Sequence, residues 1–324
     1  MAVIPQIPTN IRVHLGSPGS NAPTITLPFA DYIKNVASSE IYSTWDTPAL
    51  RANILAQVSF ALNRIYTEWY PSRGYDFDIT NDTYYDQKFI NGRNIYENIS
   101  KIVDELFNDY LRKEGNINPF FAAYCNGTTV TCEGLSQWGS QTLANQGYSD
   151  VDILEYYYGD DIEIVVNAPI AENIPSYPDT PLKKGDLNES VRRMQIYLSR
   201  ISGNYPAIPK IPVINGAFDE NTENAVKTFQ RIFSLTPDGI IGKATWYKIK
   251  SIFNGVRGLA ELEAEGRAPR PVAVSPQPDD QISMMDLSSQ QICQALEAIH
   301  VETLTPIEAM NELYKLKKML GDSL

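Results

Sequence analysis

The sequence predicts an α+β protein with a mixed α/β N-terminal domain, a small three-helix domain and a C-terminal pair of helices. Several stretches have apolar residues every three or four positions, which is typical of one face of a helix, and a few short stretches alternate as strands do. Two proline-rich segments interrupt these patterns. The 324 residues exceed what one small domain needs, so several domains are expected.

The proline-rich segments mark the expected domain boundaries. They cover residues 167–181 and 266–281, with four prolines in each. Neither has helical or strand periodicity, as is typical of linkers. The expected division is a first domain at 1–170, a linker at 171–182, a three-helix domain at 183–265, a second linker at 266–285 and a helical tail at 286–324.

In the first domain, alternation predicts a strand that starts at Thr24. Thr47 and Pro48 form a favourable helix start, with threonine as the cap and proline at the first helical position. Apolar residues then recur at helical spacing. The expected helices cover residues 31–39, 47–65, 94–110, 135–146 and 151–158, and a strand follows at 162–166.

The net charge of −12, with a pI of about 4.7, argues against nucleic acid or an anionic membrane as a partner. Residues 1–175 hold 10 basic and 21 acidic side chains and 24 of the 34 aromatic residues. Such a surface suits sugar binding, because rings stack on pyranoses and carboxylates bind hydroxyls. An ordinary aromatic core under an acidic surface has the same composition. No apolar run is long enough to span a membrane.

Two stretches of the first domain resemble the stage II sporulation protein D family. One runs from Tyr32 to Glu40 and continues through Trp45 into an alanine-rich stretch at residues 49–56. The other is Gly134-Leu-Ser-Gln-Trp-Gly139 with its continuation to residue 147, followed by residues 153–159. Asp86-Gln87 lies where the family often has the same pair. The resemblance covers roughly residues 10–168.

Members of that family cleave the glycan strands of peptidoglycan without water, so the resemblance implies one general acid/base carboxyl. Glu40 matches it, and its position between an apolar helix face and Trp45 favours a raised pKa. A solvated surface glutamate is the alternative. The other side chains expected at the site are substrate-binding residues: Tyr32, Trp45, Arg64, Gln137, Trp138 and Tyr157.

This sequence departs from the family pattern at several positions. The alanine-rich helix continues differently after Ala56. Cys125 and Cys132 have no histidine nearby, so a disulfide, two free thiols and a metal site stay open. Ser136 is not expected to be a hydrolase nucleophile, because the Gly-x-Ser-x-Gly pattern is absent and no histidine is close in sequence. No metal and no cofactor is expected.

Residues 181–250 resemble the type 1 peptidoglycan-binding domain. The resemblance rests on Gly185, Val191, Gln195, the stretch Asn215-Gly-Ala-Phe-Asp219, and Asp238-Gly-Ile-Ile-Gly-Lys-Ala-Thr-Trp246. Apolar spacing predicts three helices, with tight turns at the glycines before the third. We expect most of these residues to serve packing and turns rather than ligand contact.

The tail from residue 286 contains two predicted amphipathic helices, each with a capping pattern at its start. So short a unit cannot bury its apolar faces alone. Residues 304–318 also resemble the C-terminal self-association segment of the DNA mismatch-repair MutS proteins. We therefore expect residues 286–324 to support homo-oligomerisation.

The two resemblances together imply a peptidoglycan lytic transglycosylase that a wall-binding domain holds on its polymer. The expected partner is the peptidoglycan glycan strand. The alternative is a non-catalytic cell-wall-binding protein or a structural protein of a spore or phage particle. The expected place of action is the cell wall or spore envelope. The first eight residues show no signal peptide, so we expect synthesis as a cytoplasmic protein with an unknown release route.

Overall fold

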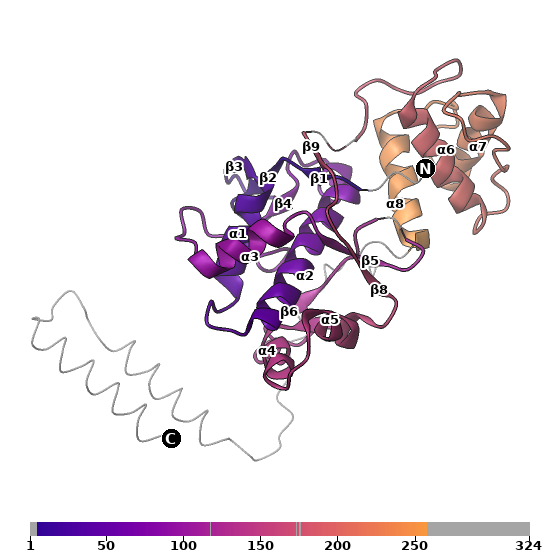
Figure 1. The fold of residues 1–324 in the computed structure, drawn as a ribbon. Helices are drawn as coiled ribbons and strands as arrows, with labels where there is room; N and C mark the ends of the chain where they lie inside the picture. The colour runs from indigo at the N-terminus through magenta and orange to yellow at the C-terminus, as the bar shows by residue number, and fades with distance from the viewer. Residues whose placement is uncertain (1–4, 117, 173, 175, 258–324) are drawn as a thin grey trace, which may run out of the picture. The chain divides into compact units, whose positions relative to one another are not determined.

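The computed structural model describes residues 5–257 except 117, 173 and 175, and it has the α+β composition that the sequence predicts (Figure 1). Two hydrophobic cores lie within these residues, one formed from residues 7–168 and one from residues 182–253. The helices of the first core are α1 (Phe29–Glu40), α2 (Thr47–Tyr66), α3 (Glu97–Leu106), α4 (Gln137–Asn145) and α5 (Asp150–Tyr158), with a short 3-10 turn at Pro71–Arg73.

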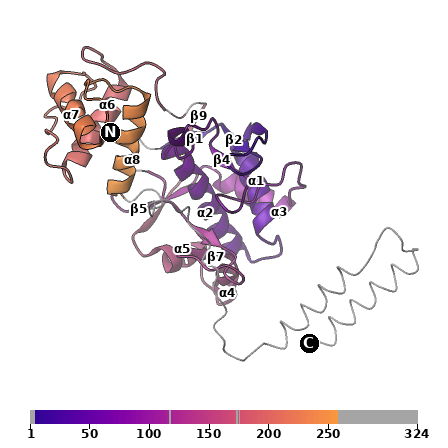
Figure 2. The same ribbon diagram turned by 180° about the vertical axis from the view of Figure 1, so that it is seen from behind.

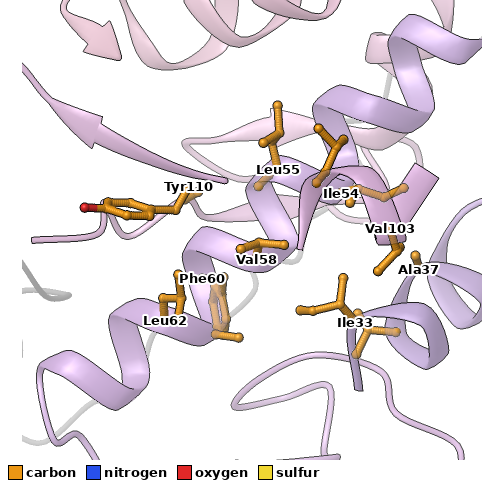
Figure 3. Packing of buried hydrophobic residues seen from close by; sticks show 14 of the residues in the cluster. Ile33, Ala37, Ile54, Leu55, Val58, Phe60, Leu62, Val103 and Tyr110 are labelled. Carbon is orange, nitrogen blue, oxygen red and sulfur yellow. The ribbon is translucent and has the colours of Figure 1, made fainter. Parts of the chain in front are cut away.

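Helix α2 is the centre of the first core. Most of its residues between Ala49 and Arg64 are buried on every face, so neighbours surround it instead of covering one stripe. It contacts α1, α3, α4, α5 and β5, which Figures 1 and 2 show around it. Figure 3 shows its apolar side chains packed with those of neighbouring helices, including Ile33, Ala37 and Val103. A fixed central helix gives the site described below a rigid support.

Short strands surround these helices. In the three-stranded sheet, β2 pairs antiparallel with β3 and parallel with β4. The other sheets have two strands each: β1 with β9 and β6 with β7 are parallel, and β5 with β8 is antiparallel. The strands are β1 (Ile7–Pro8), β2 (Asn10–His14), β3 (Thr24–Pro28), β4 (Ile79–Thr80), β5 (Tyr110–Lys113), β6 (Tyr124–Cys125), β7 (Leu135–Ser136), β8 (Ile162–Val165) and β9 (Ile170–Ala171).

The second core is built from α6 (Glu189–Ser202), α7 (Glu220–Ile232) and α8 (Lys243–Arg257). Two buried glutamines tie these helices to the glycine turns. Gln195 accepts a hydrogen bond from the backbone N–H of Gly216, and Gln230 accepts one from Gly239, each over 2.9 Å. Because each amide also donates to nearby groups, its burial carries little penalty. The glutamines in this segment are therefore structural, as the sequence predicts.

A buried ion pair joins the end of α2 to α8. Glu68 and Lys250 are 4% and 3% exposed, and the lysine Nζ lies 2.7 Å from Oε1 of the glutamate. The indole N–H of Trp246 donates to the other oxygen, Oε2, over 3.3 Å. Two donors to one buried carboxylate compensate its loss of hydration.

Several element boundaries differ from expectation, and three of the differences have a clear structural reason. The helix expected at 94–110 ends at Leu106, because Tyr110–Lys113 instead pairs with β8. The helix expected from residue 135 begins at Gln137, because Ser136 caps it through a hydrogen bond from Gly139 N–H. The cap of α2 is Asp46 rather than Thr47, which lies one position inside the helix.

The expected linker at 266–285 and the expected helical tail at 286–324 lie outside the described residues. The domain boundaries and the oligomerisation of the tail therefore stay predictions. Within residues 5–257, none of the helices combines the length and hydropathy that crossing a membrane requires.

Candidate active site around Glu40

Glu40 is the last residue of α1, and its carboxylate accepts hydrogen bonds from four separate parts of the chain. The backbone N–H of Lys88 donates to Oε1 over 2.7 Å. The amides of Gln57 on α2 and Gln137 on α4 donate to Oε2 over 3.1 and 3.4 Å. The hydroxyl of Tyr124 on β6 also hydrogen-bonds to the carboxylate. The glutamate is half-buried and fixed, unlike a solvated surface side chain.

Two opposing effects set the acidity of Glu40. Burial raises its pKa because the charged form loses hydration, whereas the hydrogen bonds from Tyr124, Lys88 and Gln57 lower it. Burial prevails and raises the pKa from 4.5 to about 7. Near neutral pH the carboxyl is therefore present in both forms. A group that must first donate and then accept a proton needs this balance.

Gln87 holds two of the groups that surround Glu40. Its Nε2 donates to the backbone oxygen of Gln57 over 3.1 Å and to the hydroxyl of Tyr124 over 2.9 Å. Its Oε1 accepts from the hydroxyl of Tyr32 over 3.1 Å. Since Gln87 and Tyr32 are 1% and 0% exposed, this chain of hydrogen bonds forms a fixed layer behind the carboxylate.

Asp86, the residue before Gln87, holds the segment that carries Gln87 and Lys88 in place. Asp86 accepts from Nε of Arg64 over 2.8 Å and from the backbone N–H of Thr80 over 2.9 Å, and it also accepts from the hydroxyl of Tyr70. Both partners of the ion pair are buried, at 2% and 0% side-chain exposure. The pair thereby fixes the backbone that presents Gln87 and Lys88 to the site.

The disulfide between Cys125 and Cys132 closes a loop directly after Tyr124. It resolves the three alternatives that the sequence leaves open for these cysteines. Within the loop, Gly127 has a φ of +79°, and a Cβ there would lie 1.8 Å from Oγ of Ser136. The carbonyl of Asn126 accepts from the N–H of Trp138 over 3.2 Å. The loop is therefore packed against the start of α4.

The structure brings some of the expected site residues together and separates others. Gln137 touches Glu40, and Trp45 and Trp138 lie in ring contact with centroids 5.1 Å apart. Tyr157 hydrogen-bonds Ser136, and a Cβ at Gly139 would lie 2.0 Å from its hydroxyl. The substrate-binding roles of these residues stay predictions.

Tyr32 and Arg64 lie deeper than a substrate-contacting side chain would. Tyr32 is fully buried behind Gln87, and Arg64 is 2% exposed. The guanidinium of Arg64 also lies 4.4 Å from the ring centroid of Trp69. In this structure both side chains hold other residues of the site in place: Tyr32 donates to Gln87, and Arg64 pairs with Asp86.

Sequence reasoning missed Gln57, Tyr124 and the backbone N–H of Lys88 as contacts of Glu40. A signal was available for Gln57, which lies four residues after Asn53 in an otherwise apolar helix and so places two amides on one buried face. No comparable signal marks Lys88, because a backbone donor has no side-chain signature.

Ser136 is the cap of α4, as its hydrogen bond from Gly139 requires. His14, the histidine among the described residues, contacts Thr24 and Ser20. In the described part of the chain, no group of three His, Cys, Asp or Glu side chains has an arrangement that could hold a metal ion.

Two family models match this chain, one in the second core and one in the tail. Residues 188–249 match the family described as "Putative peptidoglycan binding domain", which supports peptidoglycan binding and action at the cell wall. Residues 288–319 match the family described as DNA mismatch repair protein MutS C-terminal region, over a short stretch outside the described residues.

A curated relative is the zinc D-Ala-D-Ala carboxypeptidase of Streptomyces albus G. It is 41% identical over 68 residues, which are 21% of this chain. The matched part spans a quarter of the relative's own length. The similarity therefore relates one segment of this chain to part of a protein named for an action on D-Ala-D-Ala.

Proposed function

We propose that this chain is a peptidoglycan lytic transglycosylase in which Glu40 serves as general acid and then as general base. The observation that carries the proposal is the half-buried Glu40 carboxyl, held by four hydrogen bonds with a pKa near 7. The resemblance to the stage II sporulation protein D family supports the reaction type. The match of residues 188–249 supports the polymer.

In the proposed reaction, protonated Glu40 donates its proton to the glycosidic oxygen. The bond from that oxygen to the anomeric carbon breaks, and the bonding electrons go to the departing oxygen. The 6-hydroxyl oxygen of the same sugar then bonds to the anomeric carbon, and its proton passes to the Glu40 carboxylate. The products are a 1,6-anhydro end and a free hydroxyl, and the enzyme regains its starting form without water.

The surroundings of Glu40 fit both halves of this cycle. Burial favours the protonated carboxyl that the first half needs, and the donors from Gln57, Gln137 and Lys88 stabilise the carboxylate formed there. Asp86, the other carboxylate named near the site, forms a buried ion pair with Arg64, so we do not assign it as a second acid/base group. One acid/base group suffices when a hydroxyl of the substrate replaces water, whereas glycosidases ordinarily use two carboxyls.

The second core, in which residues 188–249 match a peptidoglycan-binding family, would contribute by tethering the chain to its polymer. A domain that holds the chain on peptidoglycan raises the local concentration of glycan near Glu40. The wild-type protein should therefore digest sacculi faster than short soluble glycans at the same concentration of linkages.

The proposal is tested by incubating purified sacculi with wild-type protein, Glu40→Gln and the control Glu155→Gln. The control changes an exposed glutamate on α5. Mass spectrometry then measures the release of anhydro-muropeptides. We expect release by wild type and Glu155→Gln, and a loss of roughly 100-fold or more in Glu40→Gln. Folded wild-type protein that releases nothing, or full activity of Glu40→Gln, would overturn the proposal.

A non-catalytic wall-binding protein is the second candidate, because the family match at 188–249 concerns binding alone. The same sacculi distinguish the two candidates. Wild type and Glu40→Gln that sediment equally with sacculi, with no soluble products from either, would favour the binding protein.

A further inference from the structure

Three aromatic rings form a cluster beside Glu40. Tyr42 lies two residues after Glu40, and Trp138 directly follows Gln137, which donates to the Glu40 carboxylate. The ring centroids of Tyr42 and Trp138 are 5.5 Å apart, and Trp45 lies 5.7 and 5.1 Å from them. We refer to these three residues as the ring cluster.

The ring cluster presents two aromatic rings to solvent above a buried third ring. Tyr42 and Trp138 are 59% and 41% exposed. Trp45 is 9% exposed and packs against both rings. The two exposed rings are inclined by 49° to each other. Exposed aromatic faces held by a buried third ring are suited to stacking on a ligand.

Hydrogen bonds fix the ring cluster in place. Asp46 and Gln141 bind each other twice: the N–H of Asp46 donates to Oε1 of Gln141 over 2.9 Å, and Nε2 of Gln141 donates back to the carboxylate over 3.2 Å. The carbonyl of Ser43 accepts from the amide of Asn98 over 2.6 Å. The loop that carries Tyr42 and Trp45 is thus held to α4 and α3, so a ligand need not order it on binding.

The chemistry around the rings points to a sugar. The exposed Asp46 carboxylate and the Gln141 amide supply polar groups at the edge of an apolar surface, and a pyranose has an apolar face with hydroxyls at its rim. The position of the ring cluster next to Glu40 places it along the path of a glycan strand whose linkage reaches that carboxyl.

We propose that the ring cluster is a sugar-stacking subsite that binds an N-acetylhexosamine ring of the peptidoglycan glycan next to the linkage that Glu40 cleaves. The subsite rests on the proposed function for its substrate. It assigns a binding role to Tyr42, which the sequence pattern does not single out, and it gives Trp138 and Trp45 separate roles as contact and support.

The test uses the full chain with Glu40→Gln, which prevents turnover, and a peptide-free glycan of four N-acetylhexosamine units as the probe. Tyr42→Ala and Trp138→Ala are added singly and together, and Tyr148→Ala is the matched control, since Tyr148 is also 41% exposed. Calorimetric titration should show a Kd raised roughly 5- to 15-fold by each ring variant and more by both. The control should stay within about twofold of the parent.

A second readout separates a stacking role from a structural one. Trp138→Phe keeps an aromatic face, so it should retain most of the affinity while it reduces the tryptophan fluorescence change that the glycan causes in the parent. Unchanged melting temperatures would show that all variants fold. An affinity of Trp138→Phe close to that of the parent, together with weak binding by Trp138→Ala, supports stacking.

The contrary outcomes are distinguishable from failure of the proposed function. Equal affinity of the parent and both alanine variants, as when residues 188–249 bind the probe alone, would overturn the subsite even if wild type releases anhydro ends from sacculi. No measurable binding of the probe by the parent would overturn it as well. Failure of the proposed function is instead read from the products of the wild-type protein.

Discussion

Nε2 of Gln57 lies 3.1 Å from Oε2 of Glu40, so a buried amide in the central helix donates to the carboxylate at the end of α1. The other end of this amide, Oε1, has no hydrogen-bond partner among the described residues. A buried oxygen without a partner carries an energetic cost. The interaction with Glu40 is therefore the one clear role of the Gln57 amide.

Replacement of Gln57 by methionine should raise the pKa of Glu40 further above 7. The variant removes a donor that favours the charged carboxylate, and one such hydrogen bond corresponds to about one pKa unit. The limb of the activity profile that falls above pH 7 should move to higher pH by the same amount. A ¹³C titration of the Glu40 carboxyl measures this directly, with the exposed Gln146→Met as control. A pKa that stays constant or falls would contradict the assigned contact.

Glu40→Gln should become more stable relative to wild type as the pH rises. The unfolded glutamate ionises near 4.5 and the folded one near 7. Between these values the folded state binds more protons, so wild-type stability falls with pH while the glutamine does not titrate. The relative gain should reach at most about 3 kcal/mol above pH 7. Urea unfolding at pH 5 and pH 8 measures it, and an equal difference at both values would rule out a raised pKa.

Loss of the disulfide should weaken both the fold and the site. The bond closes a loop with a sequence separation of 7 between Cys125 and Cys132. The chain-entropy estimate for so short a loop is about 2 kcal/mol of stability. Denaturant unfolding of Cys125→Ser/Cys132→Ser should show this loss. Activity should also fall, because Tyr124 directly precedes the loop. Wild-type activity in the folded double variant would show that Tyr124 does not depend on the bond.

Arg64→Met should destabilise the protein severely, because it leaves the buried Asp86 carboxylate without its cation. Breaking a buried ion pair in this way costs about 3–5 kcal/mol. Arg64→Met combined with Asp86→Leu should recover part of the loss in thermal unfolding, since neither charge then remains. A single variant as stable as wild type would mean that solvent reaches Asp86.

The sequence predicts much of the fold because local patterns determine it. The proline near the start of α2 and the apolar spacing of α6 and α7 correspond to elements of the structure. The helix expected to continue to residue 110 did not, because pairing of Tyr110 with Val165 depends on a partner far along the chain.

The site is less accessible to sequence reasoning than the fold. The pattern around Glu40 identified the candidate acid, and a raised pKa followed from its apolar setting. The contact between Glu40 and Gln137 joins residues 97 positions apart, so only the family resemblance grouped them. Tyr124 on β6 and the N–H of Lys88 reach the carboxylate from distant parts of the chain, and no local sequence pattern specifies that approach.

The most direct test of the central claim is the origin of the oxygen at the new glycan ends. Sacculi are digested with the wild-type protein in water enriched in ¹⁸O, and the products are weighed by mass spectrometry. The proposed mechanism predicts 1,6-anhydro ends without label, because the attacking oxygen belongs to the sugar. New labelled reducing ends, formed in place of anhydro ends and in excess of the exchange seen without protein, would show attack by water and would contradict the assignment of Glu40 as the one acid/base group of a water-free cleavage.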